Sequence, residues 1–259
     1  MSGDLLEIRG LSVSHAGAFA LRAVDLDIHA GAKLAVIGES GSGKTTLALA
    51  LAGLLPPEVL VEGRVEWPGL DRAPLTGRDT GLVFQDPAAS LNPVIPVGEQ
   101  VVEGARRYLG LGRKAAHELA RNLLERVRIP EPEAALAAYA HQFSGGQLQR
   151  IAIAAAIAAR PRLLIADEAT SALDTVVQAS IVALLEELVR EEGMTLVFIT
   201  HDLALASNLA DTIAVLKDGI LVETGPTDQV LVSPAHPYTR RLLDAQIDLS
   251  APRLVGEAC

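Results

Sequence analysis

The sequence predicts an α/β fold with a mainly parallel central sheet, an antiparallel N-terminal β subdomain and an inserted helical subdomain. Three short runs rich in Val, Ile and Leu, at residues 34–37, 163–166 and 196–199, are apolar on both faces. This is the pattern of central strands in a parallel sheet. Polar residues follow each run directly. Because open α/β sheets bind ligands at the carboxyl ends of their strands, these polar residues mark the expected site.

The strands expected around this centre are antiparallel. Segments near the N-terminus that alternate apolar and polar residues are 5–8, 11–13 and 24–28. Such alternation is typical of half-exposed strands. Near the C-terminal end, residues 213–216 and 220–222 flank a turn that contains Asp218-Gly219, and Asp-Gly is a strong hairpin signal.

The middle of the chain has helical periodicity and few strand signals. The predicted helices are residues 97–108, 114–127, 133–139, 144–159 and 176–190. The proline-containing tail is expected to be an extension with one short helix around residues 238–245. We therefore predict a single domain over residues 1–259. Its expected parts are a catalytic core of residues 1–96 and 161–225, a helical subdomain of residues 97–160, and a C-terminal extension of residues 226–259.

Composition excludes several classes of protein. Of the 259 residues 49% are hydrophobic, so a large core can be buried. The net charge of −10 gives no general attraction to nucleic-acid phosphates, so no nucleic-acid partner is expected. Cys259 is the only cysteine, which excludes an intrachain disulfide and suits a reducing cytosol. No apolar run approaches the ~20 residues that a membrane span needs, so any service to a membrane should go through partners.

The glycine-rich turn after the first central run predicts a phosphate site. Residues 38–45 match G-x-x-x-x-G-K-[ST], in which glycines let the backbone N–H groups surround a phosphate and the next helix adds its positive end. Lys44 should reach the β- and γ-phosphates, and the Thr45 hydroxyl should bind Mg²⁺. A chance glycine-rich turn is the alternative, but a buried strand precedes this one and an uncharged helix follows. The residues predicted to bind a nucleoside triphosphate here are Gly38, Glu39, Ser40, Gly41, Ser42, Gly43, Lys44, Thr45 and Thr46.

Two adjacent acids end the second central run. Asp167 is placed to hold Mg²⁺, and Glu168 to orient or deprotonate an attacking water. Solvated acids at a strand end would be the plainer interpretation. The phosphate loop upstream favours the catalytic one.

A second anion site is predicted at Phe143-Ser144-Gly145-Gly146-Gln147. Ser144 can cap the following helix, whose free N–H groups bind anions. Since one nucleotide needs only one such helix, we interpret this site as serving the nucleotide of a partner chain.

Together these motifs resemble the ATP-binding subunits of ATP-binding cassette (ABC) transporters. Besides the motifs above, the resemblance includes the Gln85 loop, residues 171–174 and Thr200-His201-Asp202, all in the order of the family. It covers nearly the whole chain and implies a P-loop ABC ATPase fold, with ATP and Mg²⁺ as cofactors. The resemblance favours a functional role for His201 over the alternative of a histidine that only packs in the core or at a strand end.

The resemblance also implies the roles of single residues. Gln85 would contact Mg²⁺ and the attacking water, and His201 would contact the γ-phosphate and support Glu168. Asp174 would act across a dimer interface. His15 stands where the family usually stacks an aromatic ring on adenine, and Phe19 could substitute for it. The residues expected to face the partner's ATP are Ser144, Gly145, Gly146 and Gln147.

Residues 84–93, 97–100 and 236–243 resemble the importer group for peptides, nickel and metal-chelating opines. This implies a second ABC ATPase, with a different chain favoured over a copy, and two membrane permeases that dock near residues 85–100. It also implies a solute-binding protein and a peripheral location at the cytoplasmic face of the inner membrane. The lack of further tail cysteines shifts the expectation toward nickel or opines without excluding dipeptides. The rival functions are an exporter or lipid-extraction ATPase, a non-transport ABC ATPase and a degenerate regulatory subunit.

Overall fold

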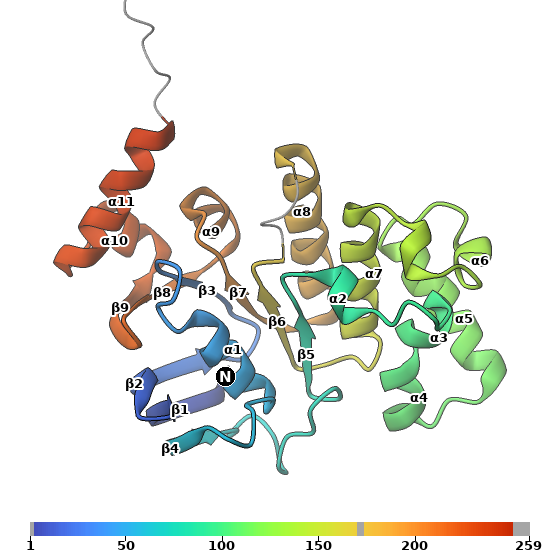
Figure 1. Ribbon diagram of the computed structural model, residues 1–259, viewed down its shortest axis with the longest axis horizontal. Coiled ribbons are helices and arrows are strands. Elements are labelled where there is room, and N and C mark those ends of the chain that lie inside the picture. Colours follow the sequence, from blue (N-terminus) through green and yellow to red (C-terminus); the bar gives the residue numbers. More distant parts are fainter. Residues whose placement is uncertain (1–2, 170–173, 251–259) are drawn as a thin grey trace, which may run out of the picture.

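Two sheets divide the strands of the chain (Figure 1). The computed structural model describes residues 3–169 and 174–250, with the side chains of 246–250 left out. The larger sheet has six strands in the order β5-β6-β7-β3-β8-β9. Its strands are β3 (Lys33–Ile37), β5 (Thr80–Val83), β6 (Leu163–Asp167), β7 (Thr195–Ile199), β8 (Thr212–Lys217) and β9 (Ile220–Pro226).

The three central runs predicted from the sequence are confirmed as neighbouring parallel strands. β7 lies between β6 and β3, and all five residues of β6 and of β7 are buried. The carboxyl ends of these strands therefore meet at one edge of the sheet. The predicted hairpin is β8–β9, which is antiparallel. Short β5, which the sequence reasoning missed, pairs in parallel with β6.

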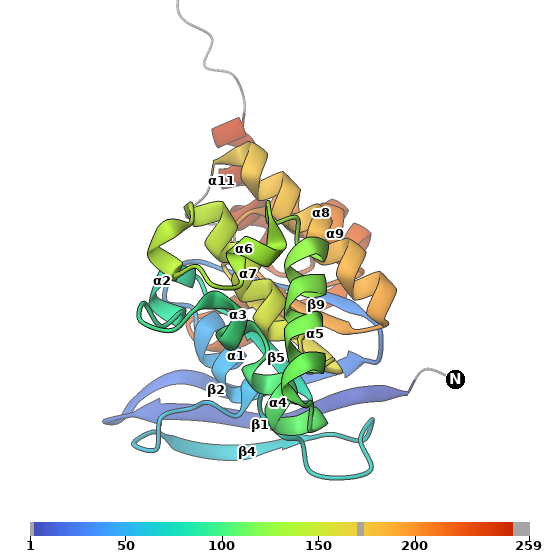
Figure 2. The ribbon, with the colours of Figure 1, turned by 90° about the vertical axis from the view of Figure 1, so that its right-hand side faces the viewer.

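The smaller sheet is antiparallel, in the order β2-β1-β4. It consists of β1 (Asp4–His15), β2 (Ala18–His29) and β4 (Leu60–Glu66). The alternating segments 5–8 and 11–13 belong to one strand, because a register shift between Ile8 and Leu11 keeps the ladder going where the alternation breaks. β4 is almost wholly exposed, so no apolar pattern marks it in the sequence. This sheet forms the bottom layer in Figure 2.

Helix α1 (Lys44–Ala52) lies between the two sheets. Its buried leucines, Leu47 and Leu51, pack in one core cluster with Leu5 and Ile8 of the small sheet and with strands of the large one. The strand–turn–helix unit that carries the glycine-rich loop is thus fixed by apolar contacts on both sides.

The helical subdomain gathers at the end of the molecule away from β9 (Figure 1). Its elements are α2 (Pro87–Ser90), α3 (Val97–Val101), α4 (Glu103–Leu109), α5 (Arg113–Arg126), α6 (Pro132–Ala135), η1 (Ala140–Gln142) and α7 (Gly145–Ile157). The predicted helix 97–108 is wrong in one respect. It is two helices, because Val102 leaves helical geometry at ψ 6°. Leu124 and Ile151 join the subdomain to the sheet through the core cluster that also holds Leu164.

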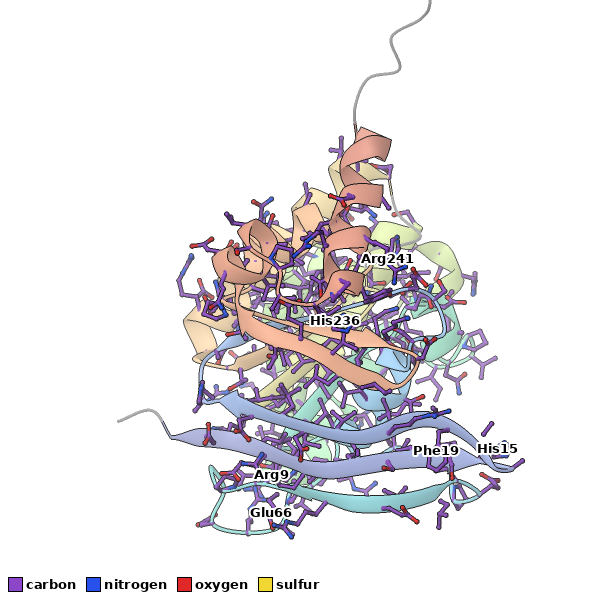
Figure 3. The ribbon with its side chains drawn as sticks, turned by 90° about the vertical axis from the view of Figure 1, so that its left-hand side faces the viewer. Arg9, His15, Phe19, Glu66, His236 and Arg241 are labelled. Atoms are coloured by element: carbon purple, nitrogen blue, oxygen red, sulfur yellow. The ribbon has the colours of Figure 1, made fainter. Side chains whose placement is uncertain are left out.

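The remaining helices are α8 (Thr175–Glu192), α9 (Leu203–Leu209), α10 (Thr227–Val232) and α11 (Pro237–Ser250). The tail has two helices where one short helix was expected. Both pack on the sheet beside β8 and β9 (Figure 3), where Val230 and Tyr238 share a cluster with Ile213 and Val215.

Within residues 3–169 and 174–250, no helix is long and apolar enough to cross a membrane. The family motif at residues 171–173 and the lone Cys259 lie outside the described residues.

Candidate functional site

The glycine-rich loop joins β3 to α1, and two of its glycines are required by close backbone approach. Gly38 has φ 154°, and a Cβ atom there would lie 2.2 Å from the carbonyl oxygen of Leu216. Gly43 has φ 103°, and its Cβ would lie 2.4 Å from the Ala20 carbonyl oxygen. Only glycine lets the loop pass between β2 and β8 in this way.

Lys44 is positioned by the loop itself. Its side chain is buried, and its Nζ donates 2.9 Å hydrogen bonds to the carbonyl oxygens of Gly38 and Glu39. An ammonium has three N–H donors, so two backbone bonds orient a third toward a ligand in the loop. Burial lowers the pKa of Lys44, while the carboxylates of Glu168 and Asp167 oppose that shift.

Asp167 ends β6 beside Thr45. Burial raises its pKa, and a hydrogen bond with the Thr45 hydroxyl acts in the other direction. Its Oδ1 is buried and has no hydrogen-bond partner among the described residues. A buried carboxylate oxygen without a donor is costly unless a cation binds it. Thr45 and Asp167 both line a cavity of about 370 Å³, together with Gln85. A carboxylate, a hydroxyl and nucleotide phosphates are ligands that Mg²⁺ takes, so these residues fit the ion.

Glu168 follows β6 and contacts residues that follow the two neighbouring strands, β5 and β7. Gln85, after β5, donates from Nε2 to Glu168 Oε2 at 3.2 Å, and His201 Nδ1, after β7, lies 3.8 Å from Glu168 Oε1. The backbone N–H of Glu168 is bonded to the Ile199 carbonyl oxygen, and its φ is 45°, a left-handed conformation that costs energy for a residue with a Cβ. The structure therefore brings together the three residues predicted to be catalytic.

The predicted second anion site lies elsewhere on the molecule. Ser144 Oγ accepts from the Gln147 N–H at 3.4 Å, and Gln147 Oε1 accepts from the Ser144 N–H at 2.9 Å, which is a capping box at the start of α7. Ser144 and Gly145 are exposed. Figure 1 shows α8 and β6 between α7 and α1, so this helix start does not join the phosphate loop of its own chain.

The other predicted residues occupy surface positions. His15 and Phe19 lie together at the tip of the β1–β2 hairpin (Figure 3). Phe19 is 49% exposed, and the Arg22 guanidinium lies 5.3 Å from its ring centroid. Asp174 is the N-cap of α8, where its side chain accepts from the Val177 N–H at 2.9 Å.

One contact at the loop was missed by the sequence reasoning. The Glu39 N–H donates to the hydroxyl of Tyr238, in α11, at 3.1 Å. The sequence of residues 236–243 indicates only a resemblance to the importer group. No local pattern shows that Tyr238 reaches a residue 199 positions earlier in the chain.

Comparison with known families gives two matches. The family described as "ABC transporter" matches residues 21–171, and "Oligopeptide/dipeptide transporter, C-terminal region" matches residues 222–258. Among curated proteins, the oligopeptide transport ATP-binding protein OppD of Bacillus subtilis is 42% identical over 92% of this chain and 71% of its own length. The glutathione import ATP-binding protein GsiA of Salmonella typhimurium is 41% identical over 97% of this chain. The chain spans only 44% of GsiA.

Solved structures agree with the fold. A dimeric ATP-binding cassette, MJ0796, in a post-hydrolysis state with ADP and phosphate, superposes with a TM-score of 0.75 at 29% identity. That match covers 86% of this chain and 98% of the other. The CbiO1 protein of Clostridium perfringens, part of the ABC transporter complex CbiONQ, gives 0.75 at 28% identity and covers 96% of both chains.

Proposed function

Because the chain belongs to the ABC transporter family of ATPases, we propose that it is the ATP-hydrolysing subunit of an importer for peptides. The observation that supports hydrolysis is the convergence of Gln85, Glu168 and His201 beside the loop that positions Lys44. The observation that supports peptide import is the match of residues 222–258, together with the relatives OppD and GsiA.

In the proposed reaction, water attacks the γ-phosphorus of ATP and ADP leaves in line. The loop N–H groups and Lys44 hold the phosphates, and Glu168 orients the water and accepts its proton. His201, whose Nδ1 lies 3.8 Å from Glu168 Oε1, would support that carboxylate and contact the γ-phosphate. Gln85 links this carboxylate to the cavity that Asp167 and Thr45 line. Mg²⁺ held by Asp167 and Thr45 would supply charge neutralisation of the phosphates.

A second chain would complete each site. The exposed capping box of Ser144 and Gln147 is a preformed anion-binding helix start that its own loop does not use. We propose that it faces the γ-phosphate of ATP held by a partner ATPase, with Asp174 near the same interface. A partner of different sequence is favoured over a copy.

The membrane partner is proposed to dock beside the Gln85 loop. Val94 is 77% exposed, and Phe84 and Ile95 are also exposed, which places apolar side chains on the surface around α2 and α3. Such a patch fits a cytoplasmic helix of a permease subunit. Movement there would reach the water-orienting group through Gln85, and the chain would lie peripherally at the cytoplasmic face of the membrane.

The first prediction tests hydrolysis. Glu168→Gln should keep ATP binding but lower turnover by at least about 100-fold, because the amide cannot accept the proton of the attacking water. ATP hydrolysis by the assembled transporter and equilibrium ATP binding are measured together. Glu118→Gln, the same substitution at an exposed position of α5, is the matched control and should hydrolyse normally. Near-normal turnover of the Glu168 variant would refute the assignment.

The solute class is tested by uptake. In cells that lack this chain, the wild-type chain should restore uptake of labelled di- and oligopeptides or glutathione, and the Glu168→Gln variant should not. Restoration of nickel uptake alone would show that the proposed solute class is wrong while the ATPase assignment stands.

A further inference from the structure

Tyr238 contacts the phosphate loop from the far end of the chain. Its hydroxyl accepts the Glu39 N–H at 3.1 Å. The carbonyl oxygen of the same residue, Glu39, accepts from Lys44 Nζ at 2.9 Å. One residue of the loop is therefore held at its N–H by the C-terminal helix and at its carbonyl by the lysine predicted to reach the phosphates.

The tyrosine ring is itself held rigidly. Tyr238 is only 4% exposed and packs in one hydrophobic cluster with Ile213 and Val215 of β8. The Lys217 ammonium lies over the ring, 5.4 Å from its centroid. Burial also raises the pKa of the Tyr238 hydroxyl, so it stays neutral and available as a hydrogen-bonding group.

A carboxylate on β9 fixes the start of α11. Glu223 accepts from the N–H groups of Ala235 and His236 at 2.7 and 3.0 Å. His236 Nδ1 in turn accepts from the Tyr238 N–H at 3.1 Å. Figure 3 shows His236 beside β9, at the foot of α11. Backbone and ring of Tyr238 are thus determined by contacts that include none of the loop residues.

We propose that Tyr238 is a positioning residue for ATP binding: it holds Glu39, and through Glu39 the carbonyl that orients Lys44. The inference rests on the proposed function, since it assigns a role to Tyr238 only if the loop binds ATP. Glycine-rich loops have many accessible conformations, and each one excluded in the free protein lowers the entropic cost of binding. The C-terminal helices then serve the nucleotide site, as well as the core.

The hydrogen bond is removed by Tyr238→Phe, which keeps the ring and its packing. The dissociation constant and KM for MgATP should rise by roughly two- to tenfold, the range expected when one neutral hydrogen bond is lost. Turnover at saturating ATP should change by less than about twofold, because the groups around Glu168 are untouched. Binding is followed by calorimetry, hydrolysis in the assembled transporter, and folding by thermal unfolding.

Tyr108→Phe is the matched control. Its hydroxyl also bonds a backbone group, donating to the Thr76 carbonyl oxygen at 2.8 Å, but it lies in α4. This variant should match the wild type in KM and turnover. Lys44→Ala separates the two hypotheses. If wild type and Lys44→Ala bind ATP equally poorly, the proposed function fails and this inference fails with it. If Lys44→Ala alone loses binding, the proposed function stands and Tyr238→Phe decides the inference.

Two results would overturn the inference while leaving the ATPase intact. One is an unchanged KM in Tyr238→Phe. The other is a rise in KM accompanied by an equally large fall in turnover, which would indicate general disruption. Should Tyr238→Phe fold poorly, Glu223→Gln gives an independent measurement. It weakens the support of α11, so a smaller rise in KM at constant turnover is expected, and no rise would count against the inference.

Discussion

At the scale of single residues, the candidate site is built from charges in unfavourable surroundings. Asp167 and Lys44 are both 5% exposed. Burial raises the pKa of Asp167 and lowers that of Lys44, and so favours the neutral form of each. An empty site of this kind is costly to fold, and a bound cation and phosphates recover that cost. Glu168 adds backbone strain to the site, since it is held in a left-handed conformation at the end of a buried strand. Function and stability therefore oppose each other at these positions.

The prediction at this scale concerns pH. The Asp167 pKa is raised above its ordinary 3.8, so between 3.8 and its raised value the folded state binds more protons than the unfolded state. Stability contributed by this group is therefore lost as pH rises through that window. Asp167→Asn should remove the loss, so the nucleotide-free variant should be more stable than the wild type at neutral pH, with a smaller difference in acid.

Chemical denaturation across pH measures this difference, and Mg²⁺-dependent ATP turnover of the same variant should fall at least about tenfold. A variant that is less stable than wild type at neutral pH would contradict the account of Asp167. Asp228→Asn, at an exposed position of α10, serves as the control and should show neither effect.

At the scale of elements, the N-terminal caps of two helices position the residues of the proposed partner interface. α7 begins with the reciprocal bonds of Ser144 and Gln147, and α8 with the carboxylate of Asp174 on the Val177 N–H. Both caps stand at the proposed partner interface. Each residue therefore has a structural role within its own chain in addition to the proposed role toward another chain, and substitutions must separate the two.

Asp174 allows that separation. Asp174→Ala should lower the free energy of unfolding by about 1 kcal/mol, because α8 loses its cap, whereas Asp174→Ser keeps a capping oxygen and should cost little. If the carboxylate also acts across the dimer, Asp174→Ser should reduce ATP turnover of the assembled transporter at nearly normal stability. Normal turnover in Asp174→Ser would limit Asp174 to capping.

At the scale of the whole molecule, the C-terminal helices are part of the core. Val230, Tyr238 and Leu243 are nearly fully buried against the sheet, in one cluster with Ile37 of β3, the strand before the phosphate loop. A tail attached in this way should unfold together with the nucleotide site.

Two valines of α10 test this. Val230→Ala, at 1% exposure, should cost about 2 kcal/mol, while Val232→Ala, at 84% exposure, should cost almost nothing. Denaturant unfolding of the Val230 variant should remain one transition with a lower midpoint. A separate early transition, with the main one unchanged, would show that the tail is an independent unit.

Local pattern by itself determined much of this protein. The central strands, the hairpin at Asp218-Gly219 and the main helices were predictable because burial on two faces, alternation and helical periodicity are properties of neighbouring residues. The phosphate loop was predictable for a related reason, since glycine spacing dictates a backbone shape. Strands β4 and β5 escaped, because one is exposed and the other is only four residues long.

The tertiary structure decided which residues distant in sequence come into contact. Gln85, Glu168 and His201 follow three different strands, and only the order β5-β6-β7 brings them within contact. The bond between Tyr238 and Glu39 depends on how α11 packs on the sheet, which no local pattern specifies. Contacts between segments far apart in sequence follow from the packing of all the elements together, and for that reason the support of the phosphate loop by the C-terminal helix became visible only in the folded chain.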